Sequence, residues 1–183
     1  MIIDFITSNE HKFREINAFL SKGNVQIRWI REKYEEIQEN TTESISKNSA
    51  EKLSLTRKEP FFIEDTGLYI DSLGGFPGPY SAYVSSTIGN SGILNLLQGK
   101  ERSANFLTVV AYWDGKSVHT FSGKIEGKIT DRIRGNNGFG YDPIFQPDGS
   151  EMTLAEMEIV EKNKNSHRIL ALKKFLLFLK SED

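Results

Sequence analysis

The chain has 183 residues, of which 23 are basic and 25 acidic, so its formal net charge is −2. Proteins that bind a long nucleic acid usually show a basic excess or a basic stripe, and this near balance argues against such a partner. The absence of cysteine excludes disulfides and thiolate metal sites and fits a reducing cytoplasm. No apolar run approaches the ~20 residues of a membrane span, so we expect a soluble, cytoplasmic protein with one domain over residues 1–183.

The first third of the chain alternates between strand and helix patterns. Apolar residues 2–6 predict a buried strand, and Thr7-Ser8-Asn9 then offers turn and capping side chains before a helix that ends near Leu20. The same alternation continues with a strand over 25–30, a mostly polar helix over 42–57 and a strand over 61–64. This order predicts an α/β fold in which helices pack on a sheet.

The middle of the chain is rich in glycine and proline. Three glycines and two prolines within 73–80 predict a shaped loop without regular structure. A short helix over 90–97 follows, with four inward-facing apolar residues, Ile93, Leu94, Leu96 and Leu97.

Two long strands are predicted over 105–113 and 117–129. Asp114-Gly115 joins them and favours the positive dihedral angles of a tight hairpin. A second glycine-rich loop over 134–140 and an amphipathic helix over 166–179 follow. Because the sequence shows no clear linker, we expect the long strands to weave any second lobe into the sheet.

Carboxylates stand where two predicted strands end. Glu64-Asp65 closes the strand over 61–64, and Glu36 follows the strand over 25–30. Burying charge is costly, so acids at a strand end usually meet a metal ion, a cation or a reacting proton. Mg²⁺ takes few protein carboxylates and completes its shell with water and phosphates, so Glu36 and Asp65 would suffice. The alternative is a set of solvated surface acids.

Cations and an aromatic cluster supply further candidates. Lys12 lies in the first turn of a helix, where free N–H groups attract anions, although the spacing matches neither a Walker A motif nor a dinucleotide fingerprint. Phe139-Gly140-Tyr141-Asp142 has the ring and the acid needed to stack on a nucleobase and accept its N–H protons. Lys162 and Ser166-His167-Arg168 add two cations and an imidazole. Ordinary helix caps and a core aromatic beside a turn remain the alternatives.

Taken in order, these segments resemble the inosine triphosphate pyrophosphatase family, also called the Ham1 family. The resemblance runs from residue 2 to about residue 179 and depends on six ordered motifs. They are Thr7-Ser8-Asn9 with Lys12, Glu36-Ile37-Gln38, Glu64-Asp65-Thr66-Gly67-Leu68, the loop from Leu73 to Ser81, Phe139-Gly140-Tyr141-Asp142-Pro143-Ile144-Phe145, and Ser166-His167-Arg168.

The resemblance implies an elongated two-lobed α/β fold around a long central mixed sheet flanked by helices, with a cleft between the lobes. It also implies a homodimer that acts on a free nucleoside triphosphate, without a nucleic acid polymer or a membrane as partner. The implied reaction is the Mg²⁺-dependent hydrolysis of ITP, dITP and XTP to the monophosphate and pyrophosphate.

The resemblance also implies roles for individual residues. Asp65 would be the general base and, with Glu36, a metal ligand, while Glu64 would support it. The phosphate-binding residues would be Thr7, Ser8, Asn9, Lys12, Thr66 and Lys162, with Lys47 or Lys52 as a further contact. Phe139 would stack on the base, Gly140, Tyr141 and Asp142 would line its pocket, and His167 and Arg168 would contact the 6-oxo group.

Two other functions stay open at this point. One is a Maf-type pyrophosphatase that acts on modified pyrimidine nucleotides. The other is a nucleotide-binding module without catalytic activity.

Overall fold

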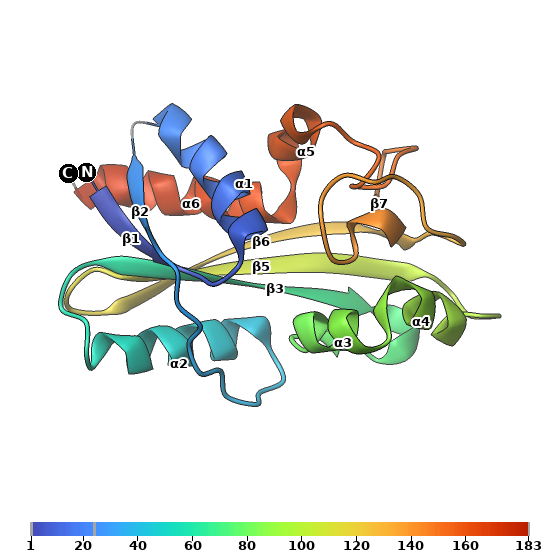
Figure 1. Cartoon of the computed structure of the whole chain (residues 1–183), viewed down its shortest axis with the longest axis horizontal. Coiled ribbons are helices and arrows are strands. Elements are labelled where there is room, and N and C mark those ends of the chain that lie inside the picture. Colours follow the sequence, from blue (N-terminus) through green and yellow to red (C-terminus); the bar gives the residue numbers. More distant parts are fainter. Residues whose placement is uncertain (1, 24, 183) are drawn as a thin grey trace.

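The structure, a computed structural model, describes residues 2–23 and 25–182 and places helices on both faces of one mixed sheet of seven strands (Figure 1). The strands are β1 (Ile2–Ile6), β2 (Gln26–Ile30), β3 (Phe61–Ile70), β4 (Pro77–Gly78), β5 (Ser103–Trp113), β6 (Val118–Ile129) and β7 (Phe145–Pro147). The α-helices are α1 (Glu10–Leu20), α2 (Thr42–Ser54), α3 (Ser81–Thr87), α4 (Gly89–Leu96), α5 (Ile159–Asn165) and α6 (His167–Glu182). Three short 3₁₀ helices span Ser21–Gly23, Asp71–Leu73 and Asp142–Ile144. The α/β class with a long central mixed sheet is therefore confirmed.

The sheet combines a parallel part with a long antiparallel part. β1 lies between β2 and β3 and runs parallel to both, whereas β3, β5, β6 and β7 pair antiparallel in that order. β3, β5 and β6 run along the long axis of the molecule, past α2 at one end and α3 and α4 at the other (Figure 1). The predicted hairpin between β5 and β6 is confirmed, since Gly115 has a φ of 99° and Asp114 Oδ1 accepts hydrogen bonds from the N–H groups of Lys116 and Ser117.

β3 is longer than the sequence predicted. The prediction ended this strand at Glu64, but the strand continues to Ile70 and pairs with β5 over its whole length. Glu64 and Asp65 therefore lie in the middle of a strand and not at its end. The strand tolerates the buried Glu64 because cations from two helices far away in the sequence, Lys12 and Arg168, contact its carboxylate.

Two other predictions need correction. The loop over 73–80 contains regular structure, because Pro77–Gly78 forms β4 and pairs antiparallel with β3. This pairing is compatible with proline because the strand is short and lies off the main path of the sheet. Leu96 was expected to face inward but is 44% exposed, whereas Ile93 and Leu97 are buried. Ile93 and Leu97 are one helical turn apart and share the buried face, and Leu96 lies to one side of it.

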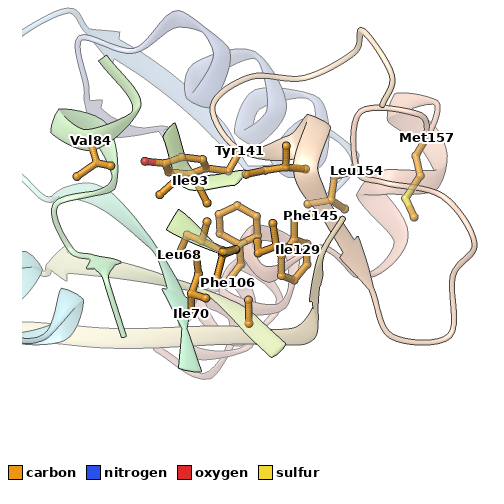
Figure 2. Packing of buried hydrophobic residues seen from close by; sticks show 13 residues of the cluster. Leu68, Ile70, Val84, Ile93, Phe106, Ile129, Tyr141, Phe145, Leu154 and Met157 are labelled. Atoms are coloured by element: carbon orange, nitrogen blue, oxygen red, sulfur yellow. The ribbon is translucent and has the colours of Figure 1, made fainter. Parts of the chain in front are cut away.

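Apolar cores lie toward the two ends of the sheet, and polar side chains gather between them. One cluster packs α3, α4 and the region around β7 against β3, β5 and β6, with Leu68, Phe106 and Phe145 among its buried members (Figure 2). A second cluster packs α1 and α6 on the sheet, where the ring of Phe62 stacks on that of Phe5 at 4.5 Å. This division leaves polar and charged side chains at the middle of β3.

The N-terminus of α6 lies very close to β6. A Cβ atom at Gly123 would lie 2.1 Å from the carbonyl oxygen of His167, so only glycine permits this approach. The close packing fixes His167 and Arg168 beside the middle of the sheet. Within residues 2–23 and 25–182, none of the helices combines the length and the apolar character needed to cross a membrane.

Candidate functional site

Two neighbouring cavities open where the start of α1 faces α3. Both are lined by Asn9 and Lys12 from α1 and its N-cap and by Ala82 and Ser86 from α3. The turn before α1 is shaped by Asn9, whose Oδ1 caps the helix by accepting hydrogen bonds from the N–H groups of His11 and Lys12 at 2.9 and 3.2 Å. The cavities form the cleft between the two ends of the molecule.

The first cavity, of about 820 Å³, is polar and gathers most of the predicted phosphate and metal residues. We call it the acid cavity. Lys52 from α2 contributes to its wall and Lys47 does not, which favours Lys52 between the two lysines that the sequence left open. The predicted residues that line it are Thr7, Ser8, Asn9, Lys12, Glu36, Lys52 and Asp65.

Asp65 is held at the floor of the acid cavity by two hydroxyl groups. Tyr34 donates a hydrogen bond to Oδ1 at 3.2 Å, and Ser46 from α2 donates one to Oδ2 at 2.9 Å. Burial raises the pKa of Asp65, Lys12 opposes this shift, and Glu64 adds to it. Both carboxylate oxygens thus have a fixed direction, and the ionised form lacks full compensation by positive charge.

Glu36 lies in the same cavity, and its pKa is also raised. The main cause is the protein around the carboxyl group, which removes part of its hydration although the side chain is exposed, and the next is the negative charge of Asp65, while Lys12 lowers the pKa. Two carboxylates that disfavour each other's charge are suited to a shared cation. In the described part of the chain, no group of three or more His, Cys, Asp or Glu side chains is placed to hold a metal ion. Two carboxylates nevertheless fit Mg²⁺, which keeps several waters and binds substrate phosphates.

Glu64 points to the opposite face of β3 from Asp65, because adjacent side chains of a strand alternate. Its carboxylate is buried, with Lys12 Nζ 3.0 Å from Oε2 and Arg168 Nε 3.2 Å from Oε1. Burial alone would raise the pKa of Glu64, but Arg168 and then Lys12 lower it to about 2. Glu64 is therefore a permanently charged partner of two cations, whereas Asp65 is free to face the acid cavity.

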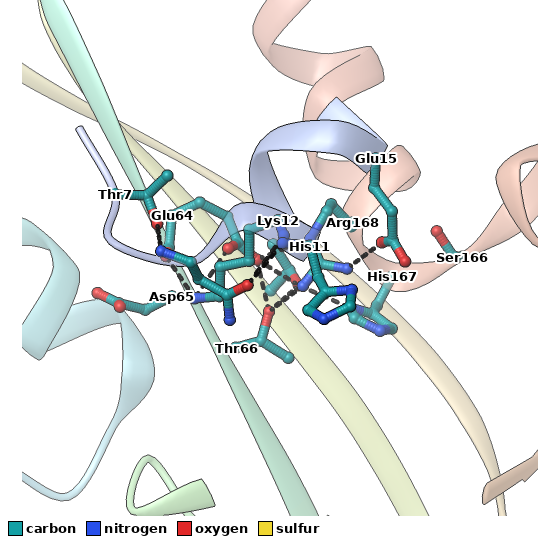
Figure 3. Close-up of polar contacts among 12 residues, drawn as sticks. Thr7, His11, Lys12, Glu15, Glu64, Asp65, Thr66, Ser166, His167 and Arg168 are labelled. Carbon is teal, nitrogen blue, oxygen red and sulfur yellow. Dashed lines mark hydrogen bonds and ion pairs between the residues drawn. The ribbon is translucent and has the colours of Figure 1, made fainter. Parts of the chain in front are cut away.

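The ion pairs of Glu64 continue through Arg168 to Glu15, as Figure 3 shows, and from there to two further charged residues. Arg168 also donates to Glu15 Oε2 at 2.6 Å, Lys162 donates to Glu15 Oε1 at 2.8 Å, and Lys162 reaches Asp142 Oδ2 at 2.6 Å. Cations and carboxylates therefore alternate along this network. We call it the buried ion network, and its members in order are Lys12, Glu64, Arg168, Glu15, Lys162 and Asp142.

The second cavity, of about 310 Å³, has mainly aromatic and small side chains around a few polar groups. We call it the aromatic cavity. The ring of Phe139 lies 5.5 Å from both the Lys162 ammonium and the Arg168 guanidinium, and it stacks with His11 at 5.3 Å. Nine of its lining residues were predicted from the sequence: Asn9, Lys12, Thr66, Phe139, Gly140, Tyr141, Asp142, His167 and Arg168.

Two predicted residues are placed differently from their expected roles. Lys162 contacts the ring of Phe139 but does not itself line the acid cavity or the aromatic cavity. Its ammonium group is buried between Glu15 and Asp142. Thr66 Oγ1 donates to Glu64 at 2.6 Å, and this hydroxyl lies at the boundary of the aromatic cavity.

Sequence reasoning missed four polar residues that organise the site. Glu15 follows Lys12 by three positions, so helical spacing would place both on one face, and this was a usable signal. Tyr34, Ser46 and Thr108 gave no local signal, because their partners are 31, 19 and 59 positions away in the chain.

Three comparisons with known proteins agree with this geometry. The sequence profile of the Ham1 family matches residues 3–178. The chain is 50% identical to the dITP/XTP pyrophosphatase of Pyrococcus horikoshii, over 98% of this chain and 97% of that one. It is 46% identical to the dITP/XTP pyrophosphatase of Thermococcus kodakarensis, over 98% of both chains.

Solved structures show the same fold. The Staphylococcus aureus Ham1 protein superposes with a TM-score of 0.84 at 26% identity, covering 98% of this chain and all of that one. A HAM1 protein from Coxiella burnetii gives a TM-score of 0.83 at 27% identity, over 98% and 99% of the two chains. The motifs, the cleft they line and these matches over nearly the whole length lead to one assignment: the chain belongs to the Ham1 family.

Proposed function

We propose that this protein hydrolyses dITP, ITP and XTP between the α and β phosphates and releases the nucleoside monophosphate and pyrophosphate. The carrying observation is the cleft itself, in which a polar cavity with Lys12, Glu36 and Asp65 adjoins a cavity with an aromatic ring and a guanidinium. A triphosphate fits the first by charge and a purine fits the second by shape and stacking. The names of the two archaeal relatives support this substrate class.

The triphosphate would lie along the start of α1. The N–H group of Ser8 and the side chains of Thr7, Ser8 and Asn9 offer hydrogen-bond donors, since the N–H groups of Thr7 and Asn9 already donate to Ile30 O and Thr7 Oγ1. Lys12 and Lys52 supply positive charge. Attack on a phosphoryl group requires that its negative charge be neutralised, and these two lysines contribute to that.

Asp65 would orient and deprotonate the attacking water. Its two oxygens are fixed by Tyr34 and Ser46, and its raised pKa makes the carboxylate a better proton acceptor than an ordinary aspartate. Bound Mg²⁺, held by Glu36 and Asp65, would supply charge neutralisation at the phosphates. Glu64 would keep Lys12 and Arg168 in place, since it contacts both.

The aromatic cavity would select the base. Phe139 offers a ring for stacking, and Tyr141 is fixed by the hydrogen bond that its hydroxyl donates to the carbonyl oxygen of Ser81 at 3.1 Å. Arg168 offers donors to the 6-oxo group, which would remain unpaired against the 6-amino group of adenine. Lys162 would act by positioning Asp142 and not by binding phosphate directly.

The test is a panel of nucleoside triphosphates assayed for pyrophosphate release with Mg²⁺ and with EDTA. We expect release from dITP, ITP and XTP, little release from dATP and none in EDTA. Preference for a modified pyrimidine nucleotide would replace this proposal with a Maf-type activity. Binding of dITP without pyrophosphate release would replace it with a non-catalytic nucleotide-binding module.

We also propose that the enzyme is a homodimer that acts on free nucleotides in the cytoplasm. Exposed aromatic side chains on α3 and just before it, Phe76, Tyr80 and Tyr83, support a partner surface there. Light scattering should give twice the chain mass of 20.8 kDa, and the monomer mass at assay concentration would contradict the dimer.

A further inference from the structure

Three short polar contacts link Glu64 to His167 through two threonines. Thr66 Oγ1 lies 2.6 Å from Glu64 Oε1, Thr108 Oγ1 lies 2.6 Å from Thr66 Oγ1, and Thr108 Oγ1 lies 2.6 Å from His167 Nδ1. Glu64, Thr108 and His167 are buried. Each of the three contacts is a hydrogen bond that requires one proton, and a threonine hydroxyl has one proton to donate.

Counting these protons fixes their positions. Glu64 is ion-paired with Lys12 and Arg168, so its carboxylate only accepts, and Thr66 must donate to it. The contact between the threonines then requires the proton of Thr108. Thr108 Oγ1 also lies 3.3 Å from Glu64 Oε1, and this longer contact shares the same proton. Since Thr108 has no second proton, the contact with the imidazole requires a proton on His167 Nδ1.

The other ring nitrogen of His167 then has no proton. The imidazole is neutral, because its burial and the nearby charges of Arg168 and Lys162 hold the pKa of His167 well below its usual range. In a neutral imidazole with Nδ1 protonated, Nε2 is an acceptor. His167 lines the aromatic cavity, and within the described part of the chain Nε2 has no hydrogen-bond partner.

We infer that Thr108 is a specificity-determining positioning residue, which holds His167 in the Nδ1–H tautomer so that the bare Nε2 accepts the N1–H of a 6-oxopurine. The inference rests on the proposed function for the identity of the base. It revises the role that the resemblance implied for His167, since a bare nitrogen cannot donate to the 6-oxo group. Arg168 keeps the contact with the 6-oxo group. It donates the guanidinium protons that are not used in its hydrogen bonds to Glu64, Glu15 and Thr66.

This arrangement makes a definite selection among purines. Hypoxanthine and xanthine present N1–H as a donor beside O6 as an acceptor, and they match Nε2 and Arg168. Adenine reverses both groups, so its bare N1 would face a bare Nε2 and its amino group would face a guanidinium. Guanine presents the same N1–H and O6 as hypoxanthine, so this pair of residues does not reject it.

The tautomer can be measured without substrate by ¹⁵N NMR on protein with labelled histidine. The His167 signals are assigned by comparison with His167→Asn, since His11 and His119 are the other two histidines. We expect a protonated Nδ1 and an unprotonated Nε2 at pH 7 in the wild type and in Thr108→Ser, which keeps the hydroxyl. A protonated Nε2 in the wild type, whether neutral or imidazolium, would overturn the inference.

Kinetics then test the link to specificity. Thr108→Val keeps the shape and removes the hydroxyl, so we expect the ratio of kcat/KM for dITP over dATP to fall at least tenfold, with dGTP over dATP falling in parallel. Thr108→Ser should keep both ratios. An unchanged ratio in Thr108→Val with a folded protein would overturn the inference. If the wild type fails to hydrolyse dITP, the proposed function fails, whereas the NMR result still decides the tautomer.

Discussion

The two cavities of the cleft differ in how their charges are balanced. Around the aromatic cavity, three cations and three carboxylates alternate in the buried ion network, and the pKa values of Glu15 and Glu64 are lowered. In the acid cavity, the pKa values of Glu36 and Asp65 are raised. The first set of charges is complete in the folded chain, and the second set is suited to a cation and a phosphate that arrive with the substrate. Four predictions test this contrast.

The largest effect is expected from Asp65→Asn. Loss of the carboxylate removes the proposed water activator and one metal ligand, so kcat for dITP should fall about 10³-fold. Calorimetry should still detect dITP binding, because Lys12 and the aromatic cavity remain. The exposed Asp71, which directly follows the same strand, provides the control Asp71→Asn, which should keep full turnover. Retention of turnover in Asp65→Asn would show that another group activates the water.

Glu15→Ala should break the balance around the aromatic cavity. It leaves Lys162 and Arg168 each without one buried carboxylate partner, so the free energy of unfolding should fall by about 3 kcal/mol in urea titrations. Glu10→Ala on the same helix is the matched control, because Glu10 pairs with Arg14 at the surface and its loss should cost about 0.5 kcal/mol or less. Equal losses for the two variants would contradict the distinction between paired buried charges and surface charges.

The two lysines of α2 should separate in their effect on the acid cavity. Lys52→Met removes a cation from the wall of the cavity, so KM for dITP should rise about tenfold. Lys47→Met changes another exposed lysine on the same helix and should leave KM unchanged. Steady-state kinetics at saturating Mg²⁺ measure both, and the reverse pattern would assign the phosphate contact to Lys47.

The smallest effect is expected from Glu36→Gln, and its sign opposes that of Glu15→Ala. A carboxyl group whose pKa is raised on folding destabilises the folded state once it ionises, so without metal at pH 7 the variant should be more stable than the wild type. The gain should be about 0.3 kcal/mol, since Glu36 is exposed and water screens its charge. The difference should vanish below the ordinary pKa of glutamate.

The effect of Mg²⁺ on thermal stability gives a second test of the same variant. Mg²⁺ should raise the Tm of the wild type, because it binds the folded state, and it should raise that of Glu36→Gln less. Scanning calorimetry with EDTA or Mg²⁺ gives both values. An equal response of the two proteins would remove Glu36 from the metal site.

Local patterns predicted most of the sheet and helices but misplaced the end of β3. The acids at Glu64-Asp65 made the strand look finished, since a charged pair is costly inside a sheet. The compensation comes from Lys12 and Arg168, which are 52 and 104 positions away, and no pattern within one segment reveals it. The same limit explains why Lys162 was expected to meet a phosphate, although it is buried between two carboxylates.

The motifs predicted which residues line the cleft better than they predicted the hydrogen bonds and ion pairs that hold those residues. Phe139, Tyr141 and Asp142 line one cavity as expected, and Glu36 and Asp65 line the other. The hydroxyl groups that orient these side chains were not predicted, because serine and threonine occur at many surface positions and carry no charge. Their importance depends on burial and on partners brought together by the fold, as for Thr108 with His167.

The continuity of β3, β5 and β6 has a mechanical consequence for the cleft. These strands pass without interruption from the end covered by α2 to the end covered by α3 and α4 (Figure 1). The two ends are therefore built on the same three strands, and in the described part of the chain the pairing of these strands is continuous between them. Asp65 lies on β3, and the start of α6, which carries Arg168, packs closely on β6. We therefore expect the separation of Asp65 and Arg168 to change little when a nucleotide binds, and any adjustment to fall on α3 and on the loop around Phe139.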